Sequence, residues 1–184
     1  MRFSTKRAGI EATLDRVEVE VLGSMAADLL ALLGSGSGSG EQSEQDPLAA
    51  LVGMPTGPVE RPPDPALARL LPDAYRDDDQ AADDFRRYTE ADLRAGKRAQ
   101  ATAVLASLAP YPGGGRIRLD RELADAWLGF LNDLRLVLGT RLEVTEDTEL
   151  VPARDDPRAQ ALSVYGWLGW MQESLLRCLT RSPR

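Results

Sequence analysis

The chain contains no histidine and a single cysteine among its 184 residues, so the side chains that most often catalyse reactions and bind transition metals are scarce. A Ser–His or Cys–His pair and a His-dependent metal site are therefore excluded within this chain. Cys178 has no second thiol to pair with, which excludes an internal disulfide and fits a reducing compartment. We expect a protein that is not an enzyme and that uses no cofactor and no metal ion.

Long apolar runs are also missing, and none approaches the ~18 residues of a membrane span. The hydrophobic fraction of 43% and the charged fraction of 28% are typical of a globular protein. Carboxylates at Glu11, Asp15 and Glu18 interrupt the apolar segment that a secretory signal needs after its basic start. We predict a cytoplasmic protein with no membrane contact. Its net charge of −7 opposes non-specific binding to nucleic acid.

Two short strands are predicted at the N-terminus, in residues 3–14, with a turn near Arg7–Gly9. Ile10, Ala12 and Leu14 alternate with polar neighbours, which is the period of a half-buried strand. Residues 116–119 alternate in the same way and would add an edge to this hairpin.

Elsewhere apolar residues recur every three to four positions, the spacing of amphipathic helices. We predict helices over Asp15–Leu33, Pro47–Met54, Asp64–Leu71, Asp77–Leu108, Asp120–Leu138 and from Pro157 onward. Asp15, Asp64 and Asp120 are the expected N-caps, and Gly34 and Gly139 are expected to end their helices. Residues 1–184 are thus predicted to form a single, mainly α-helical domain of five to six helices with a small N-terminal β-hairpin.

Residues 34–46 read GSGSGSGEQSEQD and have no apolar side chain to bury, so we predict a flexible surface loop. The entropy cost of closing a loop grows only with the logarithm of its length, so one domain tolerates it. The alternative is a tether between two modules.

A basic cluster occupies the middle of the long helix, where apolar residues are sparse. It comprises Arg87, Arg94, Lys97 and Arg98, together with Arg86. Spacings of seven and four residues place Arg87, Arg94 and Arg98 on one helical face, which we expect to be exposed. This face is a candidate site for DNA phosphates or for an acidic partner surface. The alternative is a solvated face with i,i+4 pairs such as Glu90–Arg94.

The last helix carries a second candidate interface, made of Gly166, Trp167, Gly169 and Trp170. Glycine inside a helix costs about 1 kcal/mol, so two of them suggest a close approach by another element. Large aromatic side chains concentrate at protein interfaces, and one of the two tryptophans is a candidate anchor. Packing within the chain explains the glycines equally well.

Asp133 lies among apolar residues of the Asp120–Leu138 helix. A buried carboxylate is costly unless it is paired, so we expect a local hydrogen-bonded network, for which Arg141 is a candidate partner.

Several long phrases of the sequence are similar to a known family. They are Asp64–Asp78, Phe85–Glu90, Leu93–Lys97, Ala126–Leu142 and Tyr165–Leu175. Together with the Asp15–Leu33 helix, they resemble an actinobacterial family of unknown function, one branch of which comprises AosR-type oxidative-stress transcriptional regulators. The resemblance implies a protein partner such as an alternative sigma factor. The redox switch of that branch uses two nearby thiols, whereas this chain has only Cys178.

We therefore expect a non-enzymatic cytoplasmic regulator that binds a protein of the transcription machinery, or DNA, through its basic face. The alternative is a structural or scaffold homo-oligomer, such as a homodimer, assembled through the helix that contains Gly166 and Trp170.

Overall fold

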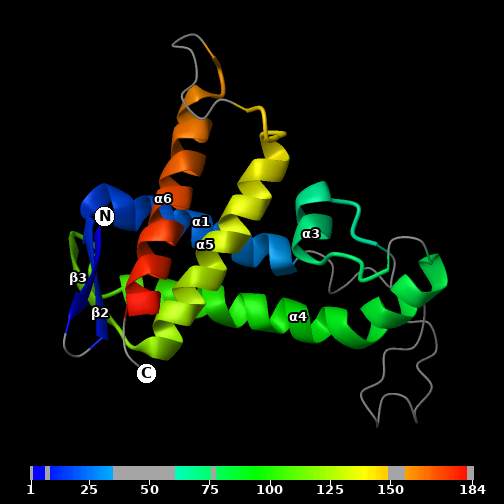
Figure 1. The fold of residues 1–184 in the computed structure, drawn as a ribbon, viewed down its shortest axis with the longest axis horizontal. Coiled ribbons are helices and arrows are strands. Elements are labelled where there is room, and N and C mark those ends of the chain that lie inside the picture. Colours follow the sequence, from blue (N-terminus) through cyan, green and yellow to red (C-terminus); the bar gives the residue numbers. More distant parts are fainter. Residues whose placement is uncertain (1, 7–8, 35–60, 76–77, 149–155, 182–184) are drawn as a thin grey trace.

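The computed structural model describes residues 2–6, 9–34, 61–75, 78–148 and 156–181. The elements follow the order β1 (Arg2–Lys6), β2 (Gly9–Asp15), α1 (Arg16–Gly34), α3 (Pro65–Leu70), α4 (Asp79–Leu108), β3 (Gly114–Leu119), α5 (Arg121–Arg141) and α6 (Ala159–Arg181). The mainly α-helical fold with a small N-terminal hairpin is confirmed (Figure 1). The helix predicted at 47–54 and the Gly/Ser-rich segment 35–46 lie outside the described residues.

The small sheet has the order β1-β2-β3, with both neighbours antiparallel to the central strand β2. Ala12 in β2 lies opposite Phe3 in β1 and Ile117 in β3, and all three side chains are buried. The predicted third strand is therefore confirmed. The alternation of apolar and polar residues along the strands determines which face of the sheet packs against the helices.

Aspartates begin the helices as the sequence predicts. The backbone N–H of Glu18 donates to Oδ1 of Asp15 over 2.9 Å, and the N–H of Asp15 donates to Oε2 of Glu18 over 2.9 Å, which completes a capping box. Asp64 and Asp120 accept hydrogen bonds at the starts of α3 and α5.

The predicted helix ends are wrong at both glycines. Gly34 is the last residue of α1 and does not adopt the left-handed conformation of a terminating glycine. Gly139 lies inside α5, which continues to Arg141. A Cβ at Gly139 would lie 3.2 Å from the ring of Tyr165, so this glycine allows α6 to pack closely on α5. The left-handed residue after α5 is Glu143, with a φ of 53°.

The helices pack around one hydrophobic core beside the sheet. α5 and α6 lie side by side, and both α1 and α5 pack on the long helix α4 (Figure 1). Trp127 of α5 is fully buried at the centre, edge-on to Phe3 and Phe130 with ring centroids 6.1 and 6.4 Å away. Its indole N–H donates to Ser107 over 3.2 Å, so the one polar atom of this large side chain is satisfied. Among the described helices, none has the length and apolar character needed to cross a membrane.

Candidate functional site

The basic cluster of α4 is not the free surface expected from the sequence. Arg94 is 9% exposed, and its Nη1 donates to the carbonyl oxygen of Leu33 over 2.9 Å, at the end of α1. Its Nη2 lies 2.6 Å from Oε1 of Glu90 on the same helix. The expected exposure of Arg94 is therefore wrong, because this guanidinium caps the Leu33 carbonyl, which the end of α1 leaves without a helical partner.

Lys97 also points inward. Its Nζ lies 2.7 Å from Oδ1 of Asp133 on α5, and that carboxylate is 2% exposed. The Asp133 network predicted from the sequence therefore exists, but the proposed partner Arg141 is wrong. Burial raises the pKa of the Asp133 carboxyl, while the hydrogen bond and charge of Lys97 act in the opposite direction. The pair thus joins α4 to α5 through the edge of the core.

Arg87 and Arg98 are the members of the predicted face that solvent reaches most easily. Nη2 of Arg87 lies 3.1 Å from a carboxylate oxygen of Asp84, and Nη1 of Arg98 donates to the carbonyl of Leu30 over 3.1 Å. A role of this cluster in binding a partner stays a prediction. Within the cluster, only Arg87 and Arg98 can reach a partner without rearrangement of the structure.

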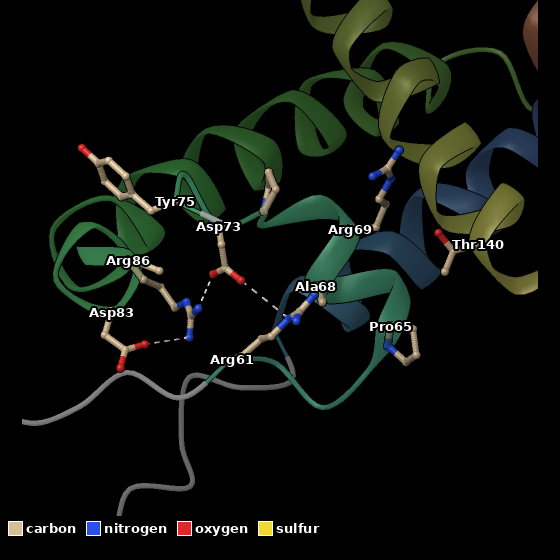
Figure 2. Close-up of a pocket in the computed structure, with 11 residues that line it drawn as sticks. Arg61, Pro65, Ala68, Arg69, Asp73, Tyr75, Asp83, Arg86 and Thr140 are labelled. Carbon is tan, nitrogen blue, oxygen red and sulfur yellow. Dashed lines mark hydrogen bonds and ion pairs between the residues drawn. The ribbon is translucent and has the colours of Figure 1, made fainter. Parts of the chain in front are cut away.

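A polar cavity of about 930 Å³ lies between α3, the start of α4 and the end of α5 (Figure 2). Arg86 of α4 is nearly buried there, in an ion pair with Asp73 and 3.7 Å from Oδ1 of Asp83. Nε of Arg61 lies 3.7 Å from the other oxygen of Asp73. This chain of alternating charges ties the segment after α3 to α4.

Arg69 lines the same cavity, but its side chain is directed away from Asp73 and toward α5 (Figure 2). The cavity lining combines three arginines with two aspartates. Because Asp73 and Asp83 already neutralise much of this charge, the cavity is better explained as a structural polar network than as an anion site.

The candidate interface on α6 borders a groove of about 590 Å³ between α5 and α6. Trp170 lines the groove and is 49% exposed, whereas Trp167 packs against the core. A Cβ at Gly169 would lie 3.5 Å from Nε of Arg135, so this glycine leaves room for the guanidinium. A Cβ at Gly166 would meet no described atom within 4 Å. The packing alternative thus explains Gly169 but not Gly166, and an interface role for these residues stays a prediction.

The sequence patterns do not predict a third surface feature, the groove between α4 and α5. Its volume is about 390 Å³, and its apolar walls are Ala99 and Ala103 of α4 with Leu123 and Ala126 of α5. Its polar rim includes Asp120, Glu122 and Asp125, and its lining contains no basic side chain. Alanines in a helix are read from sequence as ordinary helix formers, so no sequence signal marked this groove.

Within the described part of the chain, no cluster of three or more potential metal ligands is present. Cys178 is buried on α6.

Comparison with known families gives a match over nearly the whole sequence. The model of a domain of unknown function, DUF2017, matches residues 1–179. The chain belongs to the DUF2017 family. The actinobacterial resemblance found in the sequence is thereby confirmed at the level of the family.

This DUF2017 chain also has curated relatives. It is 35% identical over 179 residues to a Mycobacterium tuberculosis protein named oxidative stress regulator AosR, and the match covers 90% of this chain and 79% of that protein. The protein of the same name from Mycobacterium bovis matches with the same identity and coverage. No solved structure matches this DUF2017 chain significantly.

Proposed function

We propose that this DUF2017 protein is a non-enzymatic cytoplasmic regulator that acts by binding a protein of the transcription machinery. The observation that carries the proposal is its 35% identity, across 90% of the chain, to proteins named as oxidative stress regulators. The absence of histidine from the whole sequence supports a binding role over a catalytic one.

A protein partner fits the electrostatics better than DNA does. The chain carries a net charge of −7, and DNA presents a dense row of phosphates that such a chain repels. Two of the basic residues suited to phosphate contacts are engaged within the chain, since Arg94 bonds to α1 and Lys97 pairs with Asp133, which leaves only Arg87 and Arg98 accessible. The charged residues that line the groove between α4 and α5 are all acidic.

The α4–α5 groove is the surface we assign to that partner, and its occupant is a basic amphipathic helix. Two helices side by side present a shallow apolar groove of the kind that receives the apolar face of a third helix. Here the walls are Ala99, Ala103, Leu123 and Ala126, and the rim carries Asp120, Glu122 and Asp125. Exposed Asp92 lies two turns before Ala99 and extends the acidic surface along α4. A partner helix with lysines or arginines beside its apolar stripe is complementary to this pattern.

The test is genetic and uses a strain of the source organism from which the gene has been deleted. The strain receives either the wild-type gene or the variant Asp92→Lys/Ala99→Trp, which reverses one acidic charge on α4 two turns before the groove and fills the groove at Ala99. A matched control, Asp28→Lys/Ala27→Trp, makes the same two changes at exposed positions of α1. Transcripts are then compared before and after an oxidant is added.

We expect the deletion to alter the transcript response to oxidant, and we expect the wild-type gene and the α1 control variant to restore it. The α4 variant should fail to restore the response although circular dichroism shows it folded. An unchanged transcript response in the deletion strain would refute the regulatory role. If both variants restored the response equally, the regulatory role would stand and the assignment of the α4–α5 groove would fall. A scaffold homo-oligomer without a regulatory role predicts the unchanged response.

A further inference from the structure

The outward side of α6 presents a regular row of side chains. The row consists of Ala159, Ser163, Gly166, Trp170, Glu173, Arg177 and Thr180, each of which is exposed or half-buried. Alternating spacings of four and three residues keep these positions on one face of the helix, which is the repeat used by helices that pack against a partner helix along their length.

The row is divided by side-chain size. Its first three members, Ala159, Ser163 and Gly166, are small, and the next three, Trp170, Glu173 and Arg177, are large. Glycine is the poorest helix former after proline, and no described atom lies close enough to Gly166 to require it. One turn later, Trp170 leaves about half of its large apolar surface in solvent. Gly166, a small residue with open space around it, and Trp170, a large exposed residue, thus lie next to each other on one face of α6.

We infer that this face of α6 is the interface of a homodimer in which the α6 helices of two copies pack antiparallel. A twofold axis at the level of Leu168 places Gly166 of one copy opposite Trp170 of the second copy. The same operation places Ser163 opposite Glu173 and Ala159 opposite Arg177. A small side chain therefore meets a large one at three successive levels. Each contact occurs twice, as a closed twofold interface requires.

The groove beside Gly166 provides the space for the incoming tryptophan. It has a volume of about 590 Å³, and its lining includes Leu128, Gly169 and Leu176 as well as Gly166. Leu176 is 47% exposed and, with Trp170, adds apolar surface that association removes from water. The indole ring of the second copy thus has an apolar receiving surface at the position that the twofold axis assigns to it.

The charge distribution of this face permits a second copy to pack on it. Two chains of net charge −7 repel each other, so a stable contact requires a face with little charge of its own. The row contains one acid and one base, Glu173 and Arg177, and these two pair with each other on the same helix. The antiparallel pairing brings neither residue opposite a like charge. This face is separate from the α4–α5 groove, so the dimer does not depend on the proposed function.

Sedimentation velocity of the full chain, over a wide range of micromolar concentrations, tests the dimer. The wild type should approach twice the 20.0 kDa mass of one chain. Gly166→Leu should raise the dimer Kd at least about tenfold, since leucine fills the space that Trp170 of the second copy needs. The Tm of the monomer should not fall, because leucine is the better helix former and has open space here. Gly96→Leu is the matched control, since Gly96 also lies inside a helix with no described atom within 4 Å of an added Cβ.

A swap variant tests the pairing itself. Trp170→Gly alone removes the large side chain and should weaken the dimer, whereas Gly166→Trp/Trp170→Gly restores a large residue opposite a small one and should recover association. A single 20.0 kDa species at all concentrations would overturn the inference. So would a dimer that tolerates Gly166→Leu as well as Gly96→Leu, or a swap variant that associates no better than Trp170→Gly.

Discussion

Lys97 of α4 and Asp133 of α5 form an ion pair at the edge of the core, with Nζ 2.7 Å from Oδ1. The second carboxylate oxygen, Oδ2, is buried and has no hydrogen-bond partner among the described residues. Lys97 is thus the main compensation for a charge that burial disfavours. This ion pair joins the two helices whose outer surfaces form the α4–α5 groove. The position of the groove therefore depends on the Lys97–Asp133 pair.

Replacing Lys97 with methionine should destabilise the fold. The substitution keeps most of the side-chain volume but leaves the Asp133 carboxylate without its counter-ion. Breaking a buried ion pair in this way costs about 3 kcal/mol, the lower end of its usual range, because the Lys97 side chain remains 16% exposed. Urea denaturation at neutral pH measures the loss. An unchanged unfolding midpoint would show that Asp133 does not need Lys97.

The double variant Lys97→Met/Asp133→Leu should be more stable than Lys97→Met alone. Removing both charges also removes the penalty of burying an unpaired carboxylate, and apolar replacements of a buried pair are often neutral. The same urea titration provides the comparison. If the two substitutions destabilised additively, the pair would have no energetic coupling.

The pH dependence of stability should change in Asp133→Asn. Burial raises the pKa of the Asp133 carboxyl above its ordinary value of 3.8, so the folded chain keeps this proton at a pH where the unfolded chain has lost it. The contribution of Asp133 is therefore most favourable below pH 3.8 and falls as the pH rises through the raised pKa. The free energy of unfolding of the wild type, minus that of the variant, should decrease over this interval. Urea titrations at a series of pH values test this, and a difference that increases with pH would contradict it.

Arg94 should matter for stability far more than Arg87 does. Alanine at position 94 removes a buried hydrogen bond to the Leu33 carbonyl and leaves Glu90 without its partner, at a cost of about 2 kcal/mol. Alanine at position 87 removes only a partly exposed i,i+3 pair between half-buried Arg87 and Asp84, and it should cost about 0.5 kcal/mol. Thermal and urea unfolding of the two variants decide the matter. Equal stability of both would mean that Arg94 does not hold the end of α1.

Two adjacent glycines at the start of β3, Gly113 just before the strand and Gly114 as its first residue, should differ in their tolerance of alanine. Gly114 has a φ of +86°, and a Cβ there would lie 2.8 Å from the backbone of Leu14 and Asp15. Gly114→Ala should therefore lose about 2 kcal/mol or more, through strain and displacement of β3 from β2. At Gly113 an added Cβ meets no described atom within 4 Å, so Gly113→Ala should change stability by less than about 0.5 kcal/mol. The difference in Tm between the two variants measures the effect, and similar Tm values would refute it.

The fold was largely predictable because its signals are local. Asp15, Asp64 and Asp120 cap helices through bonds within three residues, and the alternation around Ala12 fixes the sheet face. The prediction that Gly139 ends α5 is wrong, because this glycine is needed to make room for the ring of Tyr165 on another helix. No local pattern encodes such a contact.

The candidate sites were harder to predict, because exposure depends on distant partners. Arg94 has the sequence context of a solvated residue, yet Leu33, which it bonds to, lies far away along the chain. The α4–α5 groove is built from alanines, which carry no positional signal of their own. On α6, Trp170 is exposed beside an open Gly166, and a role of these residues in an interface stays a prediction.

Site-specific photo-cross-linking in living cells tests the docking claim most directly. A photoreactive phenylalanine analogue replaces Ala99 in the α4–α5 groove or, in the control, exposed Ala27 on α1, and the adducts formed after oxidant treatment are identified by mass spectrometry. The account predicts an adduct from position 99 with a basic helical segment of a transcription protein, and no such adduct from position 27. No adduct from position 99, or the same adducts from both positions, would contradict it.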